Sequence, residues 1–394
     1  MHPFDDVVAL RRVLHRIPEL SFHEHQTSEF LKDQFAALGV GSRLVSVGGT
    51  GFYLDIGPAA AAATILLRAD MDGLPITEKT GLPYASQRPG FMHACGHDAH
   101  MAGLAATAYS LLHDAPKGVR VRVLFQPAEE GGGGALACIR DGVLDGVDMA
   151  FGIHVWNELP LGTIALTTGG VMAGVVEFAM TVRGQGGHGA VPHSATDSVV
   201  AAAQLITALQ TISSRRIAPV EPVVVTVGSI HGGEAFNVIP ATVELRGTVR
   251  AFSRETLDRV EVLMREIADG VGRTTGTTID MIYTRQSRPT VNDAGAVAVC
   301  ERALQAKAPA SKVLSGYRTM AGEDFGELLN CVPGCFLLVG SGNADRGLTE
   351  PHHSPRFEID EGVLEVSKAV FLGLVATVEA APQLVRADGG AGRQ

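Results

Sequence analysis

At 394 residues the chain exceeds what one hydrophobic core usually supports, so two domains are expected. Its composition is 46% hydrophobic and 19% charged, and its net charge of -10, without any basic run, argues against nucleic acid or an anionic membrane surface as partner. The N-terminal residues lack a basic start and an apolar stretch, and no segment is long enough to span a bilayer, so a cytoplasmic location is expected.

The first 160 residues alternate between predicted strands and predicted helices. In chain order we expect a helix at 24–38, a strand at 64–70, a helix from near Met101 to 112, and strands at 119–126 and 149–153. Strands that alternate with helices predict an α/β fold with a mostly parallel sheet. Ligands of such sheets bind beyond the carboxyl ends of the strands, and acidic residues and His154 directly follow the predicted strands.

The order of elements changes near Val175. The next predicted elements are a strand at 175–183, a helix at 196–213, strands at 223–230 and 242–250, a helix at 256–271 and a strand at 278–283. This β-α-β-β-α-β order is typical of ferredoxin-like domains. The α/β pattern resumes with a strand at 335–339 and a helix at 361–379. We therefore predict a large domain of residues 1–174 and 290–394, with an α+β domain of residues 175–289 inserted into it.

Cys95 and His97 lie two positions apart in a glycine-containing loop, just before the helix expected from Met101. A thiolate and an imidazole at this spacing can bind one metal ion. A lone pair of this kind is more often a buried Cys beside a capping His. The further histidines and the acid within residues 93–100 favour the metal site instead.

Glu129 and Glu130 follow the strand at 119–126. Adjacent acids usually form a solvated edge, but a place at the carboxyl end of an apolar strand favours a functional role. Because neighbouring side chains diverge, we expect one carboxylate to bind a metal and the other to accept a proton from water. His154 and His353, taken alone, are more simply a buried core histidine and a histidine of a surface loop.

The segment Gly184–Gly189 contains a literal G-x-G-x-x-G after a strand, which supports a nucleotide-binding protein as an alternative. The match is weak, because Pro192 and His193 interrupt the approach to the next helix and the surrounding elements are not half of a doubly wound fold. The glycines at 131–134 lack the Lys-Ser/Thr that follows in a phosphate loop, and we expect them to allow close backbone packing.

Six segments, in order along nearly the whole chain, resemble the aminoacylase and carboxypeptidase-G metallopeptidase family. They are DMDGLP at 70–75, MHACGHD at 92–98, QPAEEG at 126–131, GHGA at 187–190, FNVIP at 236–240 and GEDF at 322–325. The branch they resemble is that of hippurate hydrolases and plant indole-acetyl-amino-acid hydrolases. The resemblance implies a two-metal amidohydrolase whose inserted domain serves as a lid and in dimerisation, giving a homodimer or a dimer of dimers.

Residue by residue, the resemblance implies five metal ligands: Cys95, His97, Glu130, His154 and His353. The metals it implies are two divalent ions per subunit, of zinc, manganese, cobalt or nickel. Other branches have a metal-binding His where Asp70 stands here, so Asp70 is expected to support the ligands rather than to bind metal, and Asp72 likewise.

The resemblance also assigns roles in the reaction. Glu129 would be the general base, and His188 would hold the tetrahedral oxyanion, often in the partner subunit's site. Asn237 and Arg250 would position the substrate and its carboxylate. The implied substrate is an N-acyl-L-amino acid of the hippurate or N-acetyl type, hydrolysed to a carboxylic acid and a free amino acid. Dipeptides, N-acetyl-diaminopimelate and aminobenzoyl-glutamate are alternatives that the sequence leaves open.

Overall fold

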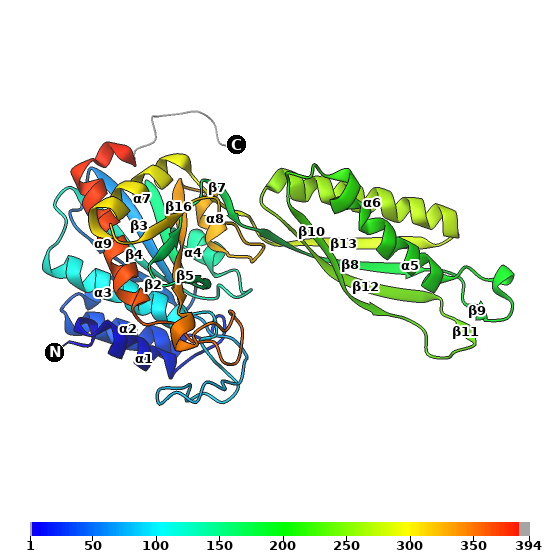
Figure 1. The fold of residues 1–394 in the computed structure, drawn as a ribbon, viewed down its shortest axis with the longest axis horizontal. Helices are drawn as coiled ribbons and strands as arrows, with labels where there is room; N and C mark the ends of the chain where they lie inside the picture. The colour runs from blue at the N-terminus through cyan, green and yellow to red at the C-terminus, as the bar shows by residue number, and fades with distance from the viewer. Residues whose placement is uncertain (1, 386–394) are drawn as a thin grey trace. The chain divides into compact units, whose positions relative to one another are not determined.

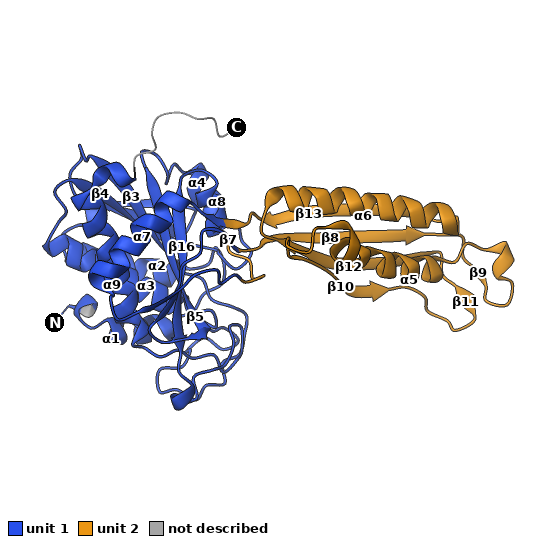
Figure 2. Cartoon of the chain, turned by 45° about the horizontal axis from the view of Figure 1, so that its top comes forward, with its two compact units in different colours: residues 1–171, 291–318, 324–394 blue, residues 172–290, 319–323 orange. Residues whose placement is uncertain are grey.

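A large mixed sheet and a smaller antiparallel sheet divide the chain into two units (Figure 1, Figure 2). The computed structural model describes residues 2–385. Unit 1 comprises Met1–Val171, Val291–Arg318 and Asp324–Gln394, and unit 2 comprises Met172–Thr290 and Thr319–Glu323. Residues 386–394, the end of the predicted large domain, lie outside the described residues.

The sheet of unit 1 has eight strands in the order β1-β2-β4-β3-β5-β16-β6-β15. Their bounds are β1 Leu44–Val47, β2 Gly51–Ile56, β3 Ala63–Asp70, β4 Val119–Gln126, β5 Met149–Pro160, β6 Thr163–Ala165, β15 Lys312–Leu314 and β16 Gly334–Gly342. The four central strands, β4, β3, β5 and β16, run parallel, and β3 and β16 are buried along their whole length. The predicted mostly parallel α/β sheet is therefore confirmed.

Helices cover both faces of this sheet. One layer contains α1 (Val7–His15), α3 (His97–His113), α7 (Ala294–Lys307) and α9 (Val363–Ala380), which pack against one another (Figure 1). On the other face, α4 (Gly134–Arg140) packs against α8 (Phe325–Leu329). A further helix, α2 (His25–Ala37), buries Leu31 and Phe35 in the same core as α3 and α9. Because α3 is apolar and buried on nearly every side, it occupies the middle of the core.

Unit 2 is built around a four-stranded antiparallel sheet in the order β10-β12-β8-β13. Its elements are β8 Gly174–Arg183, α5 Ser198–Leu209, β10 Val223–His231, β12 Thr242–Ala251, α6 Arg254–Thr275 and β13 Thr278–Ser287. The side chains of Phe178, Leu205, Leu245 and Leu263 are buried between the two helices and the sheet. Two short strands, β9 (Gly187–His188) and β11 (Val238–Ile239), form a separate ladder, and β7 (Gly169–Met172) pairs with β14 (Thr290–Asn292).

Two predicted boundaries near the metal-binding candidates were wrong. The helix expected from Met101 begins at His97, so His97 occupies its first turn. Gly96 precedes it with φ +90°, and a Cβ there would lie 2.4 Å from Val155 Cγ2, so the helix start depends on glycine rather than on a polar capping residue. His154 lies inside β5, because β16 pairs alongside β5 as far as Pro160.

Within residues 2–385, no helix is both long enough and apolar enough to cross a membrane.

Candidate metal centre

The candidate ligands meet at one level of the parallel sheet. Asp70 is the last residue of β3, and Glu129 follows the end of β4 by three positions. The register pairs Arg68 of β3 with Gly152 of β5, so His154, two residues further on, lies level with Asp70. His154 thus reaches the carboxyl edge of β3 and β4 although its own strand continues beyond it.

Hydrogen bonding sets the tautomer of His97. Its Nδ1 lies 2.8 Å from the carbonyl oxygen of Asp72, which can only accept, so Nδ1 carries a proton and, in the neutral ring that can bind a metal, Nε2 holds the lone pair. Nε2 is buried without a hydrogen-bond partner in the described chain, and it lies 3.7 to 3.9 Å from carboxylate oxygens of Asp70, Glu129 and Glu130. A cation placed between this lone pair and the three carboxylates would be bound by all of them.

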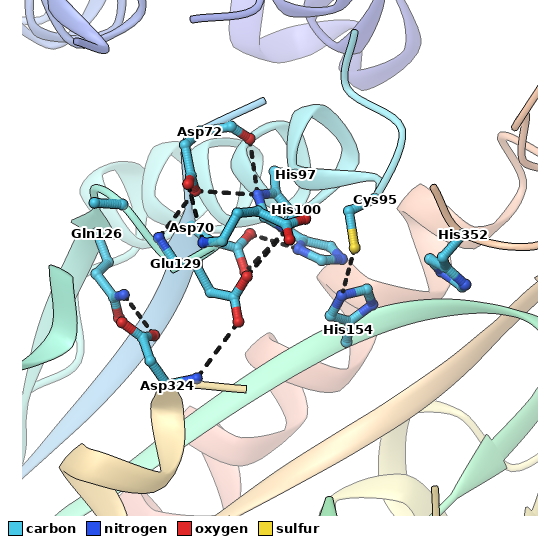
Figure 3. Close-up of polar contacts among 12 residues, drawn as sticks. Asp70, Asp72, Cys95, His97, His100, Gln126, Glu129, His154, Asp324 and His352 are labelled. Carbon is cyan, nitrogen blue, oxygen red and sulfur yellow. Dashed lines mark hydrogen bonds and ion pairs between the residues drawn. The ribbon is translucent and has the colours of Figure 1, made fainter. Parts of the chain in front are cut away.

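His154 presents the same arrangement from β5. Its Nδ1 donates to the carbonyl oxygen of Val155 at 2.6 Å, which leaves the lone pair on Nε2. That nitrogen lies 3.4 Å from Cys95 Sγ, and Figure 3 shows the two side chains pointing toward each other. Burial, reinforced by the nearby His100 and His352, holds the pKa of His154 well below its ordinary value, so the ring stays neutral and able to bind a metal.

The candidate ligand atoms form two overlapping groups of three. Cys95, His97 and His154 have ligand atoms within 4.8 Å of one another, and so do Cys95, Glu130 and His353. His353 Nε2 is 3.3 Å from Glu130 Oε1, and its backbone N–H donates to the carbonyl oxygen of Ala94 at 2.8 Å. The structure therefore brings all five predicted ligands together, with Cys95 Sγ common to both groups. Thiolate, imidazole and carboxylate together form a donor set that suits zinc and similar divalent ions.

The ionisation of these groups reflects the concentrated negative charge. Burial raises the pKa of the Cys95 thiol far above its usual value, and the charges of Glu130 and Glu129 raise it further. Burial alone would lower the pKa of His97, but Asp70, Asp72 and Glu130 outweigh it and raise that pKa to about 10. Excess negative charge contributes to both shifts, and a bound dication would neutralise it.

Asp70, expected to support the ligands rather than to bind metal, has both oxygens occupied by protein donors. Arg68 Nη1 donates to Oδ2 at 2.6 Å, and His100 Nδ1 lies 2.6 Å from Oδ1. The buried Arg68 also bonds Gln126 at 2.9 Å and Asp324 at 3.1 Å, which ties the ends of β3 and β4 to the start of α8. Sequence reasoning missed this network, although an arginine inside the otherwise apolar run of β3 was a visible signal for it.

Asp72 fixes the two adjacent acids through their backbone. Its Oδ1 accepts from the N–H of Glu129 at 3.1 Å, and its Oδ2 accepts from the N–H of Glu130 at 3.0 Å. Ser21 Oγ donates to the same carboxylate at 2.8 Å. Asp72 therefore supports two candidate ligands. Its carbonyl oxygen holds His97, as Figure 3 shows, and its side chain holds the backbone of Glu130.

The other predicted site residues lie in unit 2. His188 is in β9 and pairs with Val238 of β11, and Gly189 N–H donates to the carbonyl oxygen of Asn237 at 2.8 Å. His188 and Asn237 are thus neighbours, and both are exposed. Arg250 lies in β12, where its Nε donates to Thr248 Oγ1 at 3.2 Å.

The glycine-rich segment that suggested nucleotide binding has a different structural role. Its residues Gly187 and His188 form β9 of an antiparallel ladder, and α5 begins only at Ser198, capped by Asp197. A Cβ at Gly184 would lie 2.3 Å from the carbonyl oxygen of Thr196. The glycines therefore permit close backbone packing, and no parallel strand-turn-helix unit for a dinucleotide is formed here.

Comparisons with known proteins identify the family of this chain. A family model described as "Peptidase family M20/M25/M40" matches residues 66–377. N-acetyl-L-cysteine deacetylase from Bacillus subtilis is 40% identical over 359 residues, which are 90% of this chain and 84% of the relative. N-acetyldiaminopimelate deacetylase from Exiguobacterium sibiricum is 38% identical over 88% of this chain and 94% of its own length.

Among solved structures, a dinuclear metal-binding peptidase of the M20 family from Bacillus subtilis superposes with a TM-score of 0.82. It is 32% identical, and the match covers 96% of this chain and 99% of that chain. Fold and site define a metal-binding hydrolase, and the chain belongs to peptidase family M20/M25/M40.

Proposed function

We propose that this protein hydrolyses the amide bond of N-acyl-L-amino acids, releasing a carboxylic acid and a free amino acid. The observation that carries the proposal is the meeting of Cys95, His97, His154, Glu130 and His353 beside a further carboxylate, Glu129. Cys95 Sγ belongs to both groups of three, which supports two ions rather than one closed structural site. Two divalent ions held there would polarise the amide carbonyl and make a nucleophile of water at neutral pH.

Glu129 is assigned as the general base. Its Oε2 lies 3.9 Å from His97 Nε2, and its Oε1 accepts from the N–H of Asp324 at 3.4 Å, so its carboxylate is held at the edge of the cluster. Glu129 would take a proton from the attacking water and deliver it to the leaving amine. Glu130, fixed through Asp72 and close to His353, would serve as a ligand.

The roles in unit 2 belong to the same proposal. His188 would donate to the oxyanion of the tetrahedral intermediate, Asn237 would position the substrate, and Arg250 would bind its α-carboxylate. Gly322 leaves room for that guanidinium, since a Cβ there would lie 3.1 Å from Arg250 Nη1. A homodimer in which unit 2 mediates association and His188 completes the partner's site is part of the proposal.

Two deacetylases among the relatives favour a small acyl group. N-acetyl-amino acids are therefore the first substrates to examine, with hippurate as the larger acyl representative. N-acetyl-diaminopimelate is the second candidate, because a relative named for that activity is 38% identical over most of both chains. Dipeptides and aminobenzoyl-glutamate share the same amide and α-carboxylate chemistry and complete the panel.

The test measures amine released from this panel by protein supplied with Zn²⁺, Mn²⁺, Co²⁺ or Ni²⁺. We expect turnover of at least one N-acyl amino acid, and loss of turnover on chelation. Glu129→Gln should retain both ions and lose about 10²–10⁴-fold in kcat, as removal of a general base does. The proposal would be contradicted if no substrate of the panel released amine with any of the metals, or if the Glu129→Gln variant were active.

A further inference from the structure

Within residues 2–385, the non-glycine residues with a left-handed backbone are Phe22, Ala128 and His353, with φ of 62°, 53° and 65°. All three adjoin the candidate metal centre: His353 is a candidate ligand, Ala128 directly precedes Glu129, and Phe22 packs beside the same loop. Residues with a side chain rarely adopt this conformation, and strained backbone of this kind persists only where the surroundings enforce it. A neighbouring group should therefore hold each of these residues in its left-handed conformation.

For two of the three residues that group is one oxygen atom of Glu24. Its Oε1 accepts from the N–H of Ala128 at 2.8 Å and from the N–H of Phe22 at 3.1 Å. Its Oε2 accepts from the hydroxyl of Thr50. The side chain is fully buried, so water does not compete for these bonds.

The bond to Ala128 is the first of three along consecutive peptides. The N–H groups of Ala128, Glu129 and Glu130 donate in turn to Glu24 Oε1, Asp72 Oδ1 and Asp72 Oδ2. Two buried carboxylates thus hold the backbone from which the candidate base and a candidate ligand project. The loop also closes tightly on itself, since a Cβ at Gly132 would lie 2.6 Å from Ala128 Cβ and 3.0 Å from the ring of Phe22.

We propose that Glu24 is a positioning residue that holds Ala128 in its left-handed conformation and thereby directs Glu129 and Glu130 to the metal centre. The inference rests on the proposed function for the role of Glu129, but not for the geometry of Glu130. Without Glu24, Ala128 would relax toward an ordinary backbone conformation. Both following carboxylates would then rotate away from His97 and His353.

The test is a double-mutant cycle between Glu24 and Ala128. For each variant, the affinity for Co²⁺ is measured from the visible absorption of the ion, and kcat and KM are measured separately. Glu24→Ala should weaken binding of the weaker ion about tenfold, because the left-handed alanine is no longer held. It should lower kcat by a similar factor with little change in KM. Ala128→Gly alone should change neither quantity. In the double variant glycine adopts the conformation without help, so most of both losses should be recovered.

Two further variants separate positioning from general stability. Glu24→Gln should behave nearly as wild type, because its amide oxygen still accepts from Ala128 and Phe22 while its NH₂ group can donate to Thr50. Thr50→Val removes only the bond on the other oxygen and should lower the Tm without weakening Co²⁺ binding. If Glu24→Ala does not fold, Glu24→Asp, whose carboxylate is one methylene short of Ala128, takes its place in the cycle.

Absence of recovery by Ala128→Gly, or equal weakening of Co²⁺ binding in Thr50→Val, would overturn the assignment of Glu24. Failure of the proposed function is recognised differently: the wild-type protein would be silent on the substrate panel while the pattern of Co²⁺ affinities among the variants still held.

Discussion

The histidines around the candidate metal centre differ in whether a ring nitrogen remains available to bind a metal. In His97 and His154, Nδ1 is bound to a carbonyl oxygen and Nε2 faces the other candidate ligands. In His100 both nitrogens have protein partners, because Nδ1 lies 2.6 Å from Asp70 and Nε2 accepts from the N–H of Val155 at 2.9 Å. Although Asp70, His97 and His100 form a compact group of possible ligands, His100 has no lone pair left to offer.

This difference predicts metal content. His100→Asn should keep two ions per chain, since the ring has a positioning role, whereas His154→Asn should lose one ion or bind it at least about tenfold more weakly. The measurement is elemental analysis after dialysis against a weak chelator. A His100→Asn protein that lost an ion while His154→Asn kept both would transfer the ligand role to His100.

Arg68 illustrates how a buried charge depends on its partners. Its guanidinium contacts Asp70, Gln126 and Asp324, and the side chain is 1% exposed. Arg68→Met should destabilise the protein by about 3–5 kcal/mol, because two buried carboxylates lose their counter-charge. Denaturant unfolding of the full chain measures the loss.

The matched control for Arg68 is Arg346→Met. Arg346 pairs with Asp360 at 3.0 Å, but its side chain is 62% exposed. This substitution should cost less than about 1 kcal/mol. Similar losses for the two variants would show that the Arg68 network is not held as a buried unit.

At the scale of elements, the long connection between β3 and α3 is held by polar contacts. Glu78 Oε1 lies 3.3 Å from His15 Nε2 of α1, and Glu78 Oε2 accepts from the N–H of Ser86 at 2.6 Å. Tyr84 OH donates to Glu358 at 2.8 Å, and Lys79 N–H donates to the carbonyl oxygen of Pro355 at 2.7 Å. The connection is therefore anchored both to α1 and to the segment that follows His353.

Glu78 makes this anchoring sensitive to acid. Burial alone would raise its pKa, but hydrogen bonds from His15 and Thr80 and the charge of His15 lower it from 4.5 to about 2. The folded state thus favours the carboxylate, so the stabilisation is complete above pH 4.5 and is lost as the pH falls toward 2. Glu78→Gln should be roughly 2 kcal/mol less stable than wild type at about pH 6, and the difference should shrink to nothing in acid.

Unfolding of both proteins across this pH range measures the effect. Glu301→Gln, on an exposed position of α7, is the control and should follow wild type throughout. A constant gap between Glu78→Gln and wild type from neutral to acid pH would exclude linkage through this carboxylate.

Elements were easier to predict than the contacts that organise the site. Apolar runs such as β4 mark a buried strand by composition alone, and the acids placed directly after them pointed to the correct sheet edge. The start of α3 was predicted too late in the sequence, because Gly96 stands where a polar capping side chain usually marks the beginning of a helix. The full extent of β5 depends on β16, which lies far away in sequence. Besides contacts with near neighbours, Arg68 bonds residues 58 and 256 positions away, and Glu24 bonds residues 26 and 104 positions away. The sequence could show that Arg68 is unusual in an apolar strand, but not which distant residues it contacts.

At the scale of the whole molecule, unit 2 has edge strands through which two chains could associate. Both β10 and β13 are edge strands of its sheet, and they expose Ile230 and Ile282, which are 49% and 67% accessible. An unpaired strand with apolar side chains is a ready template for pairing with another chain. A second copy of this chain is the partner that the proposed homodimer requires.

Mixing two inactive variants tests whether His188 acts across the proposed dimer. His188→Ala and Glu129→Gln impair different units, so a mixed dimer would contain one site with both residues intact only if His188 serves the partner. Refolding the two together should restore roughly a quarter of wild-type activity. No recovery, in a sample shown by sedimentation to be dimeric, would place His188 in the site of its own chain.

The position of β16 also determines the order in which the molecule can be completed during synthesis. β5 ends at Pro160, but β16, which covers its other edge, begins at Gly334. At about 5–20 residues per second the ribosome needs roughly 10–35 s to make the intervening chain, most of which is unit 2. During that interval the nascent protein carries an apolar, unpaired edge strand and lacks His353. Newly made chains are therefore most exposed to aggregation and least able to hold metal until β16 and His353 have emerged.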